Sequence, residues 1–329
     1  MKELREIVGR LVAGEPGAVM ATLVSVEGSS YRRPGARMLL TGSGVRIGSI
    51  SGGCLEEDLT LRCLRVRATG RAELATYDTT RDNDQIWGVG MGCHGIVRIL
   101  AEPLASRPDW AAALAENFRA GLPTRLAVAW GGGDGPLGTR LAPAGQAPVP
   151  EGTFVEQVSP PTSLILFGAG DDAQPLARMA AELGWNVTVS DPRPALVTES
   201  RFPGAAALVL GPASELVGRS GAPAGSLAVV MTHHYLHDLP ILRQLLALPL
   251  AYVGLLGPKT RADQMLSEMA RDGLAVTPAM LERLRAPVGL DLGANSPEEV
   301  ALSILSEMHS VLSGRDGRPL RERTLPIHG

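Results

Sequence analysis

The sequence predicts a two-domain α/β protein, in which a mixed α+β N-terminal domain precedes a C-terminal domain built on a parallel sheet. The chain has 329 residues, which is more than one hydrophobic core usually serves. A Gly/Pro-rich stretch near its middle separates two kinds of pattern. After that stretch, apolar strands alternate with helices, as is typical of a parallel sheet covered on both faces.

The domain limits follow from the change of pattern. We expect the N-terminal domain over residues 1–130, a linker over 131–161 and the C-terminal domain over 162–329. The linker prediction rests on the glycine-rich Gly131–Gly138, on Ala142–Pro150 and on Ser159-Pro160-Pro161.

The first half of the sequence contains both helix-like and strand-like patterns. A three- and four-residue apolar spacing predicts helices, and β-rich runs bounded by glycine predict strands, one pair of them a hairpin around Thr41–Gly44. Its sheet is expected to be antiparallel in part. The expected helices are 2–13 and 54–68, and the expected strands are 18–26, 37–40, 45–50, 72–77, 96–100 and 125–130.

The second half alternates regularly. The expected strands are 163–167, 186–190, 206–210, 227–232 and 251–255, and the expected helices are 173–183, 214–218, 239–246, 260–271 and a last one up to Ser313. Ser296 is a suitable N-cap for that last helix, with Pro297 at its first position and two acids in its first turn. Its apolar positions fit either a core or a homodimer interface.

Composition excludes some function classes. The net charge of −3 and the isoelectric point near 6.1 argue against nucleic-acid binding, which needs a basic face. No apolar run reaches the length of a membrane span, and the first ten residues lack the pattern of a secretory signal. Three cysteines, an odd number, suit a reducing cytoplasm better than a disulfide framework.

A nucleotide-binding turn opens the second half. An apolar strand runs into Gly168-Ala169-Gly170 and a helix, and Asp191 ends the next strand. Gly168 and Gly170 would let the backbone turn and approach a pyrophosphate, and Asp191 would bind a ribose hydroxyl, so the pattern is typical of a Rossmann-like domain that binds NAD(P). The alternative is a scaffold without a nucleotide, because the carboxylates of Asp171 and Asp172 repel a pyrophosphate unless they point away or hold a cation.

Two other strand ends carry polar residues toward the same crevice. Lys259 and Arg261 suit an anion above the sheet, or they are solvated residues at a helix start. His233 with Asp238 is the acid–base candidate of this half. The neighbouring histidines more plausibly form local hydrogen bonds than bind a metal, and we expect no metal site.

Two glycine-framed cysteines mark the first half. Gly52 and Gly53 place Cys54 at an expected helix start, where the helix field favours thiolate and the amides would hold a phosphate. Cys93 lies in a second glycine turn. Both suit soft-ligand or sulfur chemistry, or they are small buried residues, whereas Cys63 fits the apolar face of the helix.

Taken in order, short motifs along nearly the whole chain resemble the XdhC/CoxI family, the accessory factors of xanthine dehydrogenase and related molybdenum hydroxylases. The motifs are Gly28–Met38, Ser51–Glu56, Gly92–Gly95, Gly168–Gly170, Thr232–Asp238, Tyr252–Gly257 and Pro287–Glu299. One departure is Asp171, where the family often has His, so a shared role at that position does not carry over.

The resemblance implies a protein that binds molybdenum cofactor, protects it during sulfuration with a cysteine desulfurase as partner, and delivers it to an apo molybdenum hydroxylase. Arg32, Arg33, Arg37 and the Gly52 and Gly53 amides would hold the phosphate and pterin. Cys54 would lie near the metal, and Cys93 would assist sulfur handling. Two alternatives remain: an NAD(P)-dependent oxidoreductase, and a scaffold that docks other proteins without holding a ligand.

Overall fold

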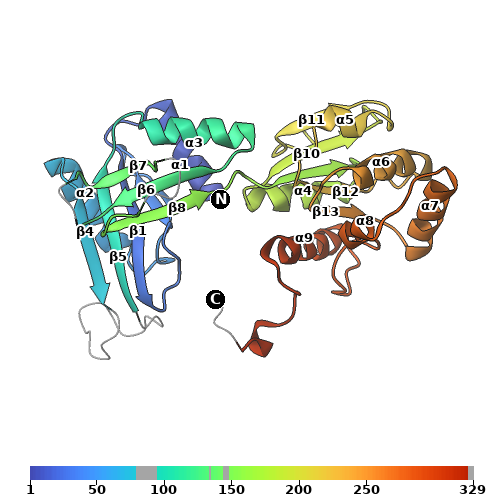
Figure 1. The fold of residues 1–329 in the computed structure, drawn as a ribbon. Helices are drawn as coiled ribbons and strands as arrows, with labels where there is room; N and C mark the ends of the chain where they lie inside the picture. Colours follow the sequence, from blue (N-terminus) through green and yellow to red (C-terminus); the bar gives the residue numbers. More distant parts are fainter. Residues whose placement is uncertain (79–94, 133–134, 144–147, 325–329) are drawn as a thin grey trace. The chain divides into compact units, whose positions relative to one another are not determined.

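The computed structural model describes residues 1–78, 95–132, 135–143 and 148–324, and the chain divides into two compact units, Met1–Pro160 and Pro161–Gly329 (Figure 1). Within the described residues, the N-terminal unit contains two sheets and the C-terminal unit contains one. No helix in these described segments is long and apolar enough to cross a membrane.

The N-terminal unit is built on a five-stranded sheet in the order β3-β2-β1-β5-β4, whose pairs are antiparallel. Alternate residues of β1 enter different hydrophobic clusters: Val19, Ala21 and Leu23 pack with helix α2, and Met20 packs with α1 and α3. The sheet is therefore covered on both faces. Its strands are β1 (Val19–Gly28), β2 (Arg37–Leu40), β3 (Arg46–Gly48), β4 (Glu73–Asp78) and β5 (Gly95–Pro103), and its helices are α1 (Lys2–Ala13), α2 (Glu56–Thr69) and α3 (Asp109–Ala120).

The stretch expected as a linker belongs to this unit, so that prediction was wrong. Strands β7 (Gly138–Leu141) and β8 (Thr153–Val158) pair with the two edges of β6 (Thr124–Ala129) in a three-stranded antiparallel sheet. Their glycine and proline neighbours are typical of a loop, but the backbone pairing to β6 overrides that composition.

The C-terminal unit has a six-stranded parallel sheet in the order β11-β10-β9-β12-β13-β14. The strand order reverses between β9 and β12, and ligands of such sheets bind at the carboxyl ends beside that switch point. The predicted fold class is confirmed. The strands are β9 (Ser163–Phe167), β10 (Asn186–Asp191), β11 (Ala207–Leu210), β12 (Leu227–Val230), β13 (Tyr252–Leu255) and β14 (Leu284–Arg285).

Helices cover both faces of this sheet (Figure 1). Leu164 and Leu166 of β9 pack with α4 and α9, and Ile165 and Phe167 pack with α6 and α7 on the other face. Ile304 of α9 is fully buried in this core, so the last helix closes the core and its apolar side is already used. The helices are α4 (Ala173–Glu182), α5 (Leu216–Ser220), α6 (Tyr235–Ala247), α7 (Lys259–Arg271), α8 (Pro278–Arg283), α9 (Pro297–Ser313) and the 3-10 turn η1 (Leu320–Glu322).

Candidate functional site

A carboxylate closes the loop before α2 in the N-terminal unit. Oε1 of Glu56 accepts hydrogen bonds from Ser49 Oγ (2.8 Å) and from the amides of Ile50 (3.0 Å) and Ser51 (2.8 Å). Its Oε2 accepts from Ser51 Oγ and from the amides of Gly53 (2.8 Å) and Leu55 (3.3 Å). We call these six donors the amide cradle. The helix begins at Glu56 and not at residue 54 because the preceding residues wrap around this side chain.

The cradle keeps Glu56 ionised. Burial by itself would raise the pKa of this carboxyl group, but the hydrogen bonds from Ser51, Ser49 and Ile50 outweigh burial and lower the pKa to about 2. The side chain is therefore an internal anion at the start of a helix, where the helix dipole also favours negative charge.

Cys54 is exposed, between the two cradle residues Gly53 and Leu55. The turn at residues 52–53 packs against Tyr31: a Cβ placed on Gly52 would lie 2.9 Å from Tyr31 Cε1, and Gly52 has a φ of 76°. The Tyr31 side chain is 63% exposed. The structure thus brings together two motifs that are separate in the sequence and places an aromatic ring beside the thiol loop.

The residues predicted to bind the phosphate and the pterin differ in their contacts and in their exposure. Gly53 donates its amide to Glu56, and Gly52 donates its amide to Ser49 Oγ (3.0 Å), so neither points to a free site. Arg37 is buried and ion-paired with Glu156. Arg32 pairs with Glu3 (2.6 Å), and both pairs border a cavity of about 350 Å³. Arg33 is exposed.

The other two cysteines differ from Cys54. Cys63 is fully buried on α2, and burial raises the pKa of its thiol to about 11, which makes it an unreactive core residue. Cys93 lies outside the described residues.

The glycine turn of the C-terminal unit crosses the neighbouring strand closely. A Cβ on Gly168, whose φ is 133°, would lie 2.3 Å from the carbonyl oxygen of Met231. Gly170 has a similar restriction, because its Cβ would lie 2.9 Å from Asp172 Oδ1. Gly168 therefore permits the close approach of the turn to the end of β12, whereas the contact at Gly170 lies within the turn itself.

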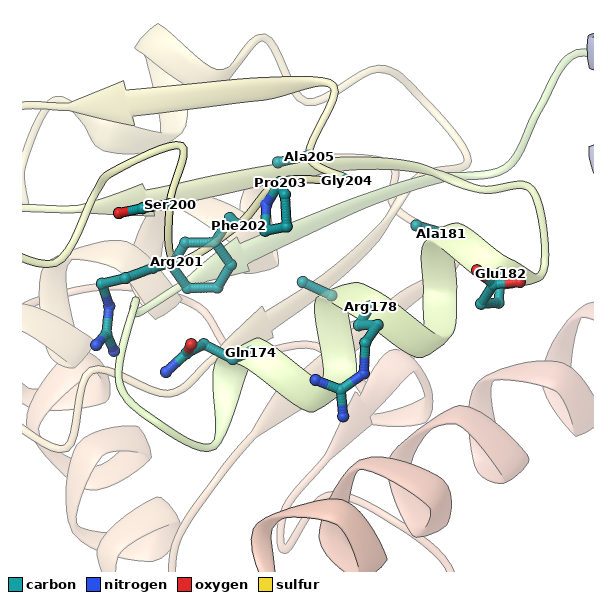
Figure 2. A pocket seen from close by; sticks show the side chains of 11 residues that line it. Gln174, Arg178, Ala181, Glu182, Ser200, Arg201, Phe202, Pro203, Gly204 and Ala205 are labelled. Atoms are coloured by element: carbon teal, nitrogen blue, oxygen red, sulfur yellow. The ribbon is translucent and has the colours of Figure 1, made fainter.

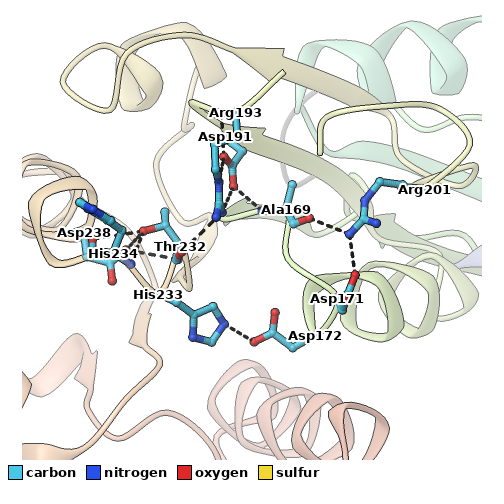
Figure 3. Close-up of polar contacts among 10 residues, drawn as sticks. All are labelled: Ala169, Asp171, Asp172, Asp191, Arg193, Arg201, Thr232, His233, His234 and Asp238. Atoms are coloured by element: carbon cyan, nitrogen blue, oxygen red, sulfur yellow. Dashed lines mark hydrogen bonds and ion pairs between the residues drawn. The ribbon is translucent and has the colours of Figure 1, made fainter. Parts of the chain in front are cut away.

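The Asp191 carboxylate is bound by donors of its own unit. It is fully buried, its Oδ1 accepts from the amide and Nε of Arg193, and its Oδ2 accepts from the Ala169 amide and Arg193 Nη2, at 2.7–2.8 Å (Figure 3). Burial raises its pKa, but the bonds from Arg193 and Ala169 outweigh that effect and lower it. All four lone-pair positions of the carboxylate are used, so it has none for a ribose hydroxyl. The turn as folded does not fit NAD(P) bound through Asp191.

The two acids that follow the glycines contact side chains of the protein itself. Asp171 Oδ1 accepts from Arg201 (2.9 Å), which also donates to the Ala169 carbonyl (3.1 Å). Asp172 Oδ2 lies 2.7 Å from His233 Nε2 (Figure 3). Among the described residues His233 is the one non-glycine residue with positive φ, at 62°, a strained conformation typical of functional sites.

The predicted pair of His233 with Asp238 is not formed. Asp238 is fully buried and accepts from the Thr232 amide (3.2 Å), from Thr232 Oγ1 (2.6 Å) and from Arg261. Burial raises the pKa of Asp238 more than these donors lower it. Asp238 and Arg261 therefore join α6 to α7 as structural residues. Lys259, the other predicted anion ligand, is exposed at the start of α7.

His234 and His237, which follow His233 in the chain, stack on each other. The rings of His234 and His237 lie 4.3 Å apart, and burial, with the charge of His234 and of Arg193, lowers the pKa of His237. In the described part of the chain, no group of three or more His, Cys, Asp or Glu side chains is arranged to hold a metal ion.

A separate cavity of about 460 Å³ lies between α4 and the loop before β11 (Figure 2). Gln174 and Arg178 extend from the helix, and Arg201, Phe202 and Pro203 extend from the loop. None of the residues predicted as ligands lines it, so it lies outside the candidate sites.

The sequence interpretation missed the part that three residues play in these sites. Glu56 belongs to a motif, but nothing in a linear pattern indicates that a carboxylate turns back into its own loop. Tyr31 also belongs to a motif, and an exposed aromatic residue beside two arginines is itself a binding signal. Asp172 was expected to repel a pyrophosphate unless it points away or holds a cation, and its distance from His233 along the chain hides their contact.

Comparisons with known proteins find related family profiles in both units. Residues 11–78 match the sequence profile described as the XdhC and CoxI family, and residues 164–308 match that of the XdhC Rossmann domain. A protein of Bacillus subtilis, named as one of the probable subunits of xanthine dehydrogenase, is 34% identical over 94% of this chain and 97% of its own length. The molybdenum cofactor insertion chaperone PaoD of Escherichia coli is 26% identical over 94% of this chain and 87% of its own.

A solved structure matches the whole chain. It is described as a xanthine dehydrogenase from Bacillus halodurans, with 28% identity, a TM-score of 0.80, and coverage of 98% of this chain and 99% of the other. The similarity therefore extends over both units and is not limited to the parallel-sheet fold.

Proposed function

Because this chain belongs to the XdhC and CoxI family, we propose that it carries molybdenum cofactor and inserts it into an apo molybdenum hydroxylase of the xanthine dehydrogenase type. The names of its relatives support an accessory role of this kind. Sulfuration of the carried cofactor, with a cysteine desulfurase as the sulfur source, belongs to the same proposal, as does a cytoplasmic location.

The observation that carries the proposal is the exposed thiol of Cys54 in a loop fixed on both sides by hydrogen bonds. Molybdenum in this cofactor is bound by sulfur, and a thiolate is a soft ligand of the same kind. A cargo molecule needs a site that is open, because it must enter and leave. An exposed cysteine suits such a site better than a buried one.

The residues around Cys54 fit the other parts of the cargo. The exposed ring of Tyr31, which packs on Gly52, is suited to stack on a planar pterin. Arg33 is exposed two residues further along and is suited to a phosphate. The amide cradle does not fit a phosphate, because the Glu56 carboxylate fills it. Arg33 is therefore the proposed phosphate ligand.

The test is retention of the cargo. The protein is purified from a host that makes molybdopterin, then denatured and oxidised, and the released pterin is measured by fluorescence with molybdenum analysis alongside. We expect near-stoichiometric pterin in the wild-type protein. We expect Cys54→Ser to retain about ten-fold less, since one soft metal ligand is lost.

Cys63→Ala is the matched control, because it removes a buried thiol and should leave retention unchanged. Cys93→Ala is included on the basis of its sequence motif. Absence of pterin from the wild-type protein after addition of excess cofactor would contradict the carrier function. Equal retention by Cys54→Ser and the wild type would contradict the role of this thiol.

A further inference from the structure

We propose that Glu56 is a positioning residue for Cys54: its carboxylate is the permanent internal anion of the amide cradle, and it holds the loop in the one conformation that presents the thiol. The proposal deepens the proposed function, on which it rests for the statement that Cys54 contacts the cargo. Glu56 itself does not touch the cargo in this scheme.

The loop needs such an anchor. Gly52 and Gly53 have φ values of 76° and 129°, and glycine pairs are the residues that gain most conformational freedom when unconstrained. Cys54 follows directly. Without a fixed point on each side, the thiol of a Gly-Gly-Cys sequence would sample many directions.

The cradle supplies fixed points on both sides of Cys54. The amides of Gly53 and Leu55, its two chain neighbours, both donate to Oε2 of Glu56. The other oxygen accepts from Ser49, Ile50 and Ser51, at the start of the loop that follows β3. One side chain therefore ties both arms of the turn together, with Cys54 between two hydrogen-bonded peptide groups.

The cradle is also closed to outside anions. A phosphate could use the same amide donors at a helix start. However, the Glu56 carboxylate is covalently tethered beside them, is only 7% exposed and is ionised at every physiological pH. A free anion must displace a tethered one, so the cargo approaches Cys54 without entering the cradle.

Glu56→Ala tests this role by emptying the cradle. The rate of Cys54 alkylation by iodoacetamide is followed by peptide mass spectrometry at one fixed pH. We expect it to rise about five-fold or more, because the released amides at the helix start then favour the attacking thiolate. We expect pterin retention to fall by a similar factor, since the thiol is no longer held in place.

Formate separates positioning from general damage. As a small carboxylate it should enter the emptied cradle and return the alkylation rate of Glu56→Ala toward the wild-type value. Cys63, buried on the same helix, should stay unreactive throughout and so report that α2 remains folded. The matched control is Glu57→Ala, which removes an exposed acid one position further on and should change neither rate nor retention.

Unchanged alkylation in Glu56→Ala, or a changed rate that formate does not reverse, would overturn the proposal. If Glu56→Ala does not fold, Glu56→Gln replaces it: the negative charge is lost and an NH₂ group faces the amide donors, so the alkylation rate should rise, but without reversal by formate because the side chain still fills the cradle. Alkylation requires no cofactor. A formate-reversible change in a protein that never retains pterin would support the positioning role and contradict the proposed function.

Discussion

Buried carboxylates of this protein are satisfied by donors from their own neighbourhood. Glu56 is bound by backbone amides and serine hydroxyls, Asp191 by Arg193 and one amide, and Asp238 by Thr232 and Arg261. Such groups cost free energy when they are buried alone, so each marks a point where several segments must fold together. They define local geometry more than they offer sites for ligands.

The pKa of Glu56 makes the stability of the N-terminal unit depend on pH. Its folded pKa of about 2 lies below the ordinary value of 4.5, so its contribution is complete above pH 4.5 and is lost as the pH falls toward 2. The pKa difference corresponds to about 3 kcal/mol. We expect the free energy of unfolding of wild type, measured in urea from pH 6 to pH 2.5, to fall more steeply than that of Glu56→Gln.

Glu57→Gln should follow the wild-type curve, because the exposed Glu57 has no part in the cradle. Parallel curves for the wild type and Glu56→Gln would show that the cradle contributes no proton-linked stability.

The sequence predicted the positions of several site residues but not their contacts. Residue type and spacing predicted that Cys54 stands at a helix start, and that glycines frame the nucleotide turn. They also placed His233 and Asp238 at one strand end, but which carboxylate His233 contacts depends on backbone direction. His233 turns toward Asp172, while Asp238 points into the unit toward Arg261, and no spacing rule distinguishes these two orientations.

At the scale of elements, the turn from β9 into α4 depends on a backbone contact with β12. A Cβ at residue 168 would meet both Met231 O and the Thr232 amide nitrogen, at 2.3 and 2.7 Å. These are backbone atoms of the two residues that directly follow the central strand β12, and they cannot move aside independently of the sheet. The positive φ of 133° adds conformational strain for any other residue.

Gly168→Ala is therefore expected to destabilise the C-terminal unit by about 3 kcal/mol or more. Urea denaturation followed by circular dichroism measures the loss. The control is Gly218→Ala in α5, where a Cβ meets nothing within 4 Å, and this change should be neutral or slightly stabilising. Equal stability of the two variants would contradict the close packing of the turn.

Most elements of the C-terminal unit were predictable because they are strongly apolar, but helix α8 was missed. Strand β9 and helix α9 begin and end where the sequence patterns predicted. Strands β7 and β8 were missed because their partly buried residues do not form a clear apolar alternation. Strand β14 has two residues, which is too short for any periodicity.

At the scale of the whole molecule, each unit has hydrophobic clusters of its own. Three clusters of the described residues lie within Met1–Pro160 and two within the rest of the chain. A unit with its own core is expected to unfold as a cooperative block.

Leu59→Ala and Ile304→Ala form a reciprocal pair of core truncations, each at a fully buried position of one unit. Each should cost about 2–5 kcal/mol in its own unit. Hydrogen exchange read by mass spectrometry should show faster exchange in peptides of residues 1–160 for Leu59→Ala, and in peptides of residues 161–329 for Ile304→Ala. Loss of protection in both units from either change would show that they unfold as one block.

The saturated carboxylate of Asp191 also limits what evolution or an engineer can make of the C-terminal unit. In a dehydrogenase of this topology the acid at the end of the second strand is free to bind a ribose. Here, removing Arg193 alone leaves a buried charge without its counter-ion, and replacing Asp191 alone leaves the Ala169 amide without an acceptor. Each single step loses stability before any cofactor binding is gained. A ribose-binding acid at this position therefore requires coupled substitutions, because no single change frees the carboxylate without a loss of stability.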